Sequence, residues 1–223
     1  MAMPDLDALQ TWLRTQLPDE ATYRIAPIGD HRADLFPQEA ELLEKAVDKR
    51  VREFSTGRVL ARAALKELGH AASPILIGDQ RKPLWPDGIS ASITHSQQIC
   101  AVVAARSKTV RGIGLDLEGA RGVGNDVARY VSTADELARN ANEVPGAALN
   151  AVVFSIREAI FKAYYPLTGA YLNFGDVSLD LNGRDGRFVA RIINDEKPAL
   201  LGQRWIDGHF LVTDQLVLSL VVV

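Results

Sequence analysis

In two segments far apart in the sequence, the spacing of the acidic residues matches the repeat of a strand or a helix, so each would project its polar side chains from one face. In the segment 112–118, aliphatic residues alternate with polar ones, so a strand would present Asp116 and Glu118 on the same face. In a helix, Glu158 and Lys162 would share a face because they are four residues apart. Three carboxylates can supply the oxygen ligands that Mg²⁺ favours, and the ion keeps positions open for water and phosphate oxygens. The pattern therefore predicts a cation site for phosphate chemistry, with a lysine beside it.

Each part of this pattern also has a simpler interpretation. A strand ending in Asp-x-Glu is typical of an exposed sheet edge, and a Glu/Lys pair at this spacing is typical of a helix surface, where it contributes about 0.2 to 0.5 kcal/mol. His95 lies in a Thr/Ser-rich turn, where a histidine commonly makes local hydrogen bonds. The four histidines lack metal-ligand spacing, and the chain has no Walker loop, nucleophile elbow or Gly-x-Gly-x-x-Gly motif. Periodicity alone therefore supports only a generic magnesium and phosphate hypothesis.

Composition bounds the possible partners. A chain of 223 residues that is 47% hydrophobic can bury a sizeable core, as one large or two small domains. Its formal net charge of -3 gives no global attraction to nucleic acid or to a membrane. A local basic patch lies between Lys45 and Lys66, and most of its charges are expected on the solvated side of a helix. Neither nucleic acid nor a membrane is an expected partner.

The sequence also indicates a compartment. Cys100 is the only cysteine and lies in an apolar run, so it is expected in the core and cannot form an intramolecular disulfide. The amino terminus lacks the basic start and apolar run of a secretory signal. The strongly apolar stretch 216–223 is too short to span a bilayer as a helix. We expect a cytoplasmic protein.

Hydrophobic periodicity predicts an α+β chain. Helices are expected at 6–17, in one or two pieces at 37–68, and at 149–165, where Pro166 would close the last. Strands are expected at 74–77, 89–93, 99–105, 110–118, 177–181, 188–193, 203–206, 210–213 and 216–223. A glycine-rich loop at 119–124 and a polar helical stretch to about 142 would connect the acidic strand to the last helix.

The order of five motifs resembles the 4'-phosphopantetheinyl transferase superfamily, in its enterobactin-synthetase type. The two acidic motifs, Gly114-Leu-Asp-Leu-Glu118 and Phe154-Ser-x-Arg-Glu-Ala-x-x-Lys162-Ala163, stand in the family's order. Upstream, Phe54-Ser-Thr-Gly-Arg58, Lys82-Pro-Leu-Trp-Pro-Asp-Gly88 and Ser92-Ile-Thr-His-Ser96 match the same type. Together the motifs cover roughly residues 36 to 175. This resemblance implies transfer of the phosphopantetheine arm of coenzyme A onto a serine of an apo carrier protein.

The resemblance assigns roles residue by residue. It implies that Asp116, Glu118 and Glu158 are Mg²⁺ ligands. Through the ion, Asp116 and Glu158 would also contact the nucleotide. Glu158 would in addition be the base that takes the proton of the carrier serine. Lys162 would contact the phosphates and stabilise the charge that develops during transfer. The remaining expected contacts to coenzyme A are His95, for the phosphates, Arg58 and Arg50, for the 3'-phosphate end, and Lys82, Pro83 and Thr94.

The resemblance also implies a fold and partners. The family fold is a pseudo-dimer of two similar α/β halves with the active site between them, so we expect halves at 1–108 and 109–223. The first would carry the basic helix and the nucleotide contacts, and the second the acidic motifs. Acyl, peptidyl or aryl carrier domains and coenzyme A are the expected partners of a monomeric enzyme. One departure is Arg157, which stands where a lysine usually precedes the family glutamate.

Two other functions remain open from the sequence. A degenerate relative would bind coenzyme A as a sensor or scaffold without catalysis. The retained set of Asp116, Glu118, Glu158 and Lys162 argues against that interpretation. A different magnesium-dependent phosphotransferase would explain the acidic residues, but it would not explain the Trp-Pro and Thr-His-Ser motifs.

Overall fold

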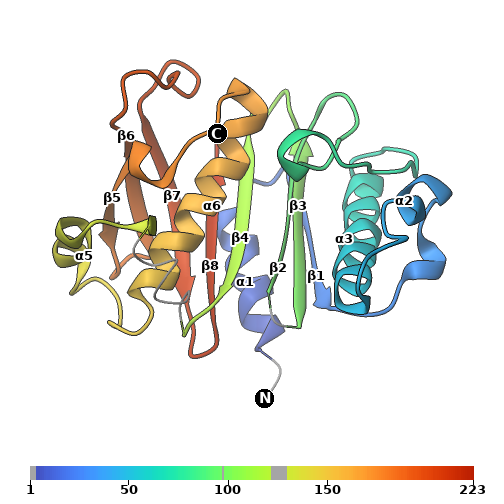
Figure 1. Cartoon of the computed structure of the whole chain (residues 1–223), viewed down its shortest axis with the longest axis horizontal. Helices are drawn as coiled ribbons and strands as arrows, with labels where there is room; N and C mark the ends of the chain where they lie inside the picture. The colour runs from blue at the N-terminus through green and yellow to red at the C-terminus, as the bar shows by residue number, and fades with distance from the viewer. Residues whose placement is uncertain (1–3, 97, 122–129) are drawn as a thin grey trace. The chain divides into compact units, whose positions relative to one another are not determined.

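The structure is a computed structural model that describes residues 4–96, 98–121 and 130–223 (Figure 1). The chain divides into two compact units, Met1–Arg111 and Gly112–Val223. Each unit packs one 20-residue helix against an antiparallel sheet. Among the described residues, no helix is both long enough and apolar enough to cross a bilayer. The predicted α+β class is confirmed.

The first unit is a three-stranded sheet in the order β1-β3-β2, covered by α3. Its elements are α1 (Leu6–Gln16), β1 (Ala21–Pro27), η1 (Arg32–Asp34), α2 (Pro37–Glu41), α3 (Asp48–Glu67), η2 (Asp79–Arg81), β2 (Ile89–Ser96) and β3 (Ile99–Arg106). The central strand β3 is apolar throughout from Ile99 to Ala105, and all seven side chains are fully buried. The predicted helix at 6–17 is confirmed, with the Asp5 side chain accepting from the Ala8 N–H as its cap.

The second unit is a five-stranded sheet in the order β4-β8-β7-β6-β5, covered by α6. Its elements are β4 (Ile113–Gly119), α5 (Ala134–Asn140), α6 (Leu149–Thr168), η3 (Phe174–Asp176), β5 (Val177–Asn182), β6 (Arg187–Ile192), β7 (Trp205–Val212) and β8 (Leu216–Val222). All its neighbouring strands are antiparallel. One face of the sheet and the apolar side of α6 form the core of the unit.

Four sequence expectations about elements are corrected. The expected strand at 74–77 is a single bridge between Ile77 and Pro83. The two strands expected at 203–206 and 210–213 are one strand, β7, which runs through Gly208. Helix α6 does not close at Pro166 but continues to Thr168 and ends at Gly169, whose φ of 66° suits a glycine. Strand β1 was not expected at all. The loop expected at 119–124 and the start of the helical stretch fall partly on residues 122–129, outside the described residues.

Candidate active site

Strand β4 and helix α6 bring the two acidic motifs together in the second unit. The two elements can approach closely because Gly114 faces the helix without a side chain. A Cβ at Gly114 would lie 1.9 Å from the carbonyl oxygen of Ala159. Asp116 is two residues further along the strand and therefore on the same face, and it is 4% exposed. The alternation that predicted a shared face is therefore present, and that face is turned toward α6.

Lys162 reaches from α6 across to β4. Its Nζ donates to Asp116 Oδ1 at 2.7 Å and to the carbonyl oxygen of Leu115 at 3.1 Å. The side chain of Lys162 is one quarter exposed, whereas that of Asp116 is almost fully buried. A charge-assisted bond of this kind in a low-dielectric setting is stronger than the helix-surface pair that spacing alone suggested. The two family motifs thus meet through a direct ion pair.

The two glutamates near this ion pair, Glu118 and Glu158, have raised pKa values. Burial, and then the like charge of Asp116, raises the pKa of Glu118 to about 7, although Lys162 opposes the shift. Burial also raises the pKa of Glu158, with Lys162 opposing and Asp116 adding to the shift. Because each glutamate responds to Asp116 and Lys162, all four groups belong to one electrostatic cluster. Among the described residues, Lys162 is the basic group that acts on both glutamates of this cluster.

The donor chemistry of this cluster fits a hard divalent cation. Its donors are carboxylate oxygens, which Mg²⁺ prefers. Burial first, and then the charge of Asp116, raises the pKa values of Glu118 and Glu158, and a bound cation would favour their ionised forms. Within 4–96, 98–121 and 130–223, no three Asp, Glu, His or Cys side chains already converge on a common metal position. The donors are of the type that Mg²⁺ prefers, but a bound ion and its ligand set are matters for the proposal below.

The predicted nucleotide-binding arginines lie on α3 in the first unit. Arg50 and Arg58 flank the ring of Phe54, with guanidinium carbons 5.7 and 4.0 Å from its centroid. Arg58 is buried, and its Nε donates to the Ile75 carbonyl oxygen at 2.7 Å. Burial above all, together with the charges of Arg50 and Arg62, lowers the pKa of Arg58 to about 10, although Glu39 opposes the shift. Such a concentration of positive charge would favour a bound anion.

A third arginine belongs to this basic cluster and was missed by sequence reasoning. The pKa of Arg50 is lowered by burial and then by the charge of Arg81, which lies on η2. Arg81 has a φ of 61°, and the turn is closed by a bond from the Gly78 N–H to the Lys82 carbonyl oxygen at 2.8 Å. The sequence signal was only a basic residue in a turn-rich run. Its proximity to Arg50 depends on how that turn folds.

The remaining predicted contacts are spread over two features of the first unit. Lys82 follows η2 and Pro83 forms the isolated bridge described above, so both lie at the turn that carries Arg81. Thr94 and His95 are consecutive on β2 and therefore point to opposite faces of the sheet. Thr94 is buried, whereas the side chain of His95 is one third exposed. The structure does not bring Thr94 onto the face that carries His95.

His95 is faced by an acid that sequence reasoning missed. Glu53 Oε1 on α3 lies 3.8 Å from His95 Nδ1, and its side chain is 13% exposed. Gly57, one turn further along α3, permits this approach, since a Cβ there would lie 3.1 Å from Ile93 Cγ2. A carboxylate opposite a histidine stabilises the charged imidazole, which is the form that binds phosphate best. Only the helix–strand register reveals this pair.

Comparisons with known proteins identify the family of the chain. Residues 38–105 match the model of the 4'-phosphopantetheinyl transferase N-terminal domain, and residues 112–218 match that of the 4'-phosphopantetheinyl transferase superfamily. Over 194 residues the chain is 38% identical to the 4'-phosphopantetheinyl transferase PptT of Mycobacterium tuberculosis, covering 82% of this chain and 86% of that protein.

Two further relatives show the same relationship. The chain is 38% identical over 177 residues to the 4'-phosphopantetheinyl transferase Svp of Streptomyces mobaraensis, covering 78% of this chain and 71% of the relative. It is 34% identical over 125 residues to enterobactin synthase component D of Salmonella typhi, covering 55% and 51%. The chain belongs to the 4'-phosphopantetheinyl transferase superfamily. The resemblance drawn from the five motifs is therefore confirmed.

Proposed function

We propose that this protein transfers the 4'-phosphopantetheine group of coenzyme A to a serine hydroxyl of an apo carrier protein. The serine oxygen forms a bond to the β-phosphorus, the pyrophosphate P–O bond breaks, and 3',5'-ADP leaves. The observation that carries the proposal is the bond from Lys162 to Asp116, which joins the two acidic motifs of the family at one place. Membership in the superfamily makes the chain a transferase that uses coenzyme A.

The residues of the second unit would handle the pyrophosphate. We assign Asp116, Glu118 and Glu158 as the groups that hold Mg²⁺. When bound, the ion neutralises charge on the pyrophosphate oxygens. Lys162, oriented by its bonds to β4, stabilises the negative charge that accumulates as the P–O bond breaks. In the first unit, Arg50, Arg58, Arg81, Lys82, Pro83, Thr94 and His95 are the proposed contacts for coenzyme A.

Glu158 is the proposed base for the serine proton. Its raised pKa makes the ionised form a stronger proton acceptor than an ordinary glutamate, but it also lowers the ionised fraction at a given pH. A neighbouring cation would shift the balance toward the ionised, less basic form. Glu158 therefore acts either directly or through a water molecule, and its role as ligand and its role as base oppose each other.

The partners follow from the reaction. An apo acyl, peptidyl or aryl carrier domain supplies the serine, and coenzyme A supplies the transferred group. Nucleic acid is not a proposed partner, because the net charge of the chain is -3. The monomeric state and the cytoplasmic location stay predictions from the sequence.

The proposal is tested by incubating the protein with coenzyme A, Mg²⁺ and a panel of apo carrier proteins, and by recording carrier masses. We expect the phosphopantetheine mass increase on at least one carrier, its loss on chelation of the metal, and its loss in Asp116→Ala. The matched control is Asp207→Ala, which removes an exposed carboxylate on β7 and should keep full activity. Binding of coenzyme A without modification of any carrier would instead indicate a sensor. Neither binding nor transfer would indicate another phosphotransferase.

A further inference from the structure

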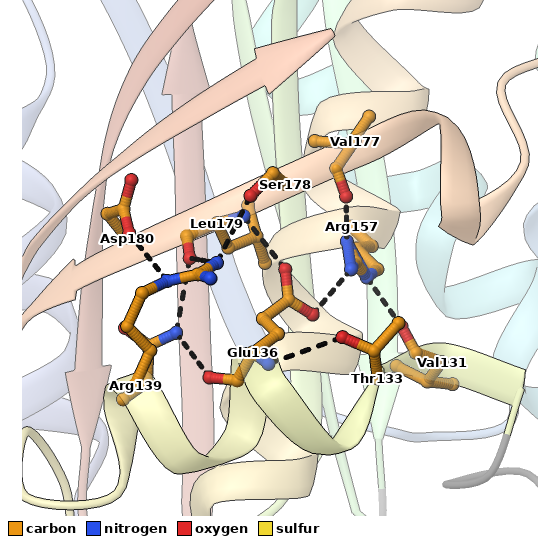
Figure 2. A network of polar contacts seen from close by, with 10 residues as sticks. Val131, Thr133, Glu136, Arg139, Arg157, Val177, Ser178, Leu179 and Asp180 are labelled. Carbon is orange, nitrogen blue, oxygen red and sulfur yellow. Dashed lines mark hydrogen bonds and ion pairs between the residues drawn. The ribbon is translucent and has the colours of Figure 1, made fainter. Parts of the chain in front are cut away.

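A buried ion pair joins helices α5 and α6 in the second unit (Figure 2). Arg157 Nη2 lies 2.7 Å from Glu136 Oε2, and the two residues are 6% and 4% exposed. Arg157 directly precedes Glu158 in the sequence. A lysine offers one compact ammonium group, whereas a guanidinium offers five N–H donors in a fixed plane.

In the structure, each of the three guanidinium nitrogens of Arg157 makes a hydrogen bond. In addition to Glu136, Arg157 donates from Nε to the Val131 carbonyl oxygen at 2.7 Å and from Nη1 to the Val177 carbonyl oxygen at 3.0 Å. Glu136 in turn accepts from the Leu179 N–H at 2.8 Å through Oε1. Arg157 therefore links α6 to the start of β5 and to the segment that leads into α5. Its partner Glu136 links α5 to β5.

These contacts set the rotation of α6 about its own axis. Successive residues on a helix are about 100° apart, so a fixed Arg157 fixes the direction of Glu158, and Lys162 lies one turn beyond Glu158 on the same face. On the other side of α6, Gly114 sets how closely the helix approaches β4. At a side-chain radius of about 5 to 6 Å, a rotation of about 10° moves a carboxylate by about 1 Å.

We propose that Arg157 is a positioning residue for phosphopantetheine transfer, which holds α6 so that Glu158 and Lys162 face Asp116 on β4. This inference rests on the function proposed above. Displacements of about 1 Å can cost about 100-fold in rate when catalytic groups must be aligned. Arg157 itself lies among the carbonyl oxygens of β5 and of the segment before α5, and it acts through the helix that carries it.

The first test is Arg157→Lys, which keeps the charge but cannot reach all three acceptors from one nitrogen. We expect kcat to fall by about tenfold or more, with the KM for coenzyme A changed less than about threefold, because most of the proposed direct contacts to coenzyme A are in the first unit. We also expect a higher Mg²⁺ concentration for half-maximal activity. As a readout besides activity, the rise in melting temperature on adding Mg²⁺ without substrates should shrink.

The matched control is Arg139→Lys, the same substitution on α5. Arg139 bonds Asp180 and Ser178 on β5 and is half exposed, and none of these contacts involves α6. It should keep the kcat and the Mg²⁺ response of the parent protein. Glu136→Gln is the second variant, because its amide can still accept from the Leu179 N–H while the ion pair is lost. It should show the same changes as Arg157→Lys to a smaller extent.

All rates are measured well below each variant's melting temperature, so that loss of folded protein does not mimic loss of alignment. If Arg157→Lys does not fold, Glu136→Gln alone decides the question. Unchanged kcat and Mg²⁺ response in the folded variant would overturn the positioning role, even if the melting temperature falls. Absence of transfer by the parent protein would instead refute the proposed function, and the Mg²⁺-induced melting shift would still report on Arg157.

Discussion

The raised pKa of Glu118 predicts that Mg²⁺ and protons compete for this carboxylate. Its pKa is raised from 4.5 to about 7 by burial first and by Asp116 second. The carboxyl group therefore titrates near neutral pH, where an ordinary glutamate is fully ionised. Because a metal ion binds the ionised form, Mg²⁺ must displace a proton from this group.

The size of the effect follows from that value. A group with a pKa of about 7 is about one tenth ionised at pH 6 and about nine tenths ionised at pH 8, so the apparent Mg²⁺ affinity should rise about tenfold over this range. About half a proton should be released for each ion bound at pH 7. The pKa of Glu158 is also raised, which makes the dependence at least this steep.

Calorimetric titration with Mg²⁺ in the absence of coenzyme A measures both quantities. Repeating the titration in buffers of different ionisation enthalpy counts the released protons directly. The control is Glu118→Gln, which should bind Mg²⁺ more weakly at pH 8 and lose most of the pH dependence. An affinity in the parent protein that is constant from pH 6 to pH 8, with no proton release, would refute the reasoning.

The same shift fixes the sign of the stability change. In the unfolded chain Glu118 titrates near 4.5, and in the folded protein it titrates near 7. The folded protein therefore holds a proton that the unfolded chain releases, so this group's contribution to stability is complete below about pH 4.5 and is lost as the pH rises through 7. Without metal, the melting temperature should fall across this interval, and Mg²⁺ should restore more of it at pH 8 than at pH 6.

Three substitutions test other parts of the site. Gly114→Ala would force a methyl group into a carbonyl oxygen of α6 and should cost about 2 to 3 kcal/mol in the free energy of unfolding, measured by denaturant titration. Gly146→Ala, which meets nothing within 4 Å, should cost far less, and equal losses would contradict the close approach. Lys162→Met should lower kcat about 100-fold with an unchanged far-ultraviolet circular dichroism spectrum, and near-normal turnover would exclude a role in charge stabilisation. Glu53→Gln should raise the KM for coenzyme A about threefold with kcat unchanged, because the imidazole of His95 loses its facing carboxylate, and an unaltered KM would show that the pair is inert.

Local periodicity predicted the elements whose two faces differ. The acidic strand alternates aliphatic and polar residues, and α6 carries a continuous apolar side, so both were found near their true bounds. Strand β1 was missed because six of its seven residues are half buried, which leaves no strong alternation. Strand β7 was divided at Gly208, although that glycine is what lets Phe188 lie against the strand, since a Cβ there would meet the Phe188 ring at 2.3 Å.

The site was predictable where chemistry and spacing coincide in one motif. The strand period placed Asp116 and Glu118 on one face, and the helix period placed Glu158 and Lys162 on another. The bond between Lys162 and Asp116 appears only when the strand packs against the helix. Glu53 and Arg157 could not be assigned in this way, since their partners are set by packing between distant segments. Glu136 lies 21 residues before Arg157, and nothing in either local pattern distinguishes this pair from solvated charges.

In helix α6, a residue that positions the helix and a residue of the proposed site are neighbours in sequence. Its residues 157 and 158 are neighbours in sequence, yet one is bonded into the interior of the unit and the next belongs to the electrostatic cluster with Asp116. A buried charge such as Arg157 is stable only when its donors are satisfied, and three acceptors on two separate segments meet that requirement. The same bonds leave α6 little freedom to rotate about its axis. The contacts that stabilise the buried charge of Arg157 therefore also fix the direction of the Glu158 side chain. A lysine at position 157 could satisfy its own charge with a single acceptor, and the helix would then depend on Gly114 and the apolar core for its alignment.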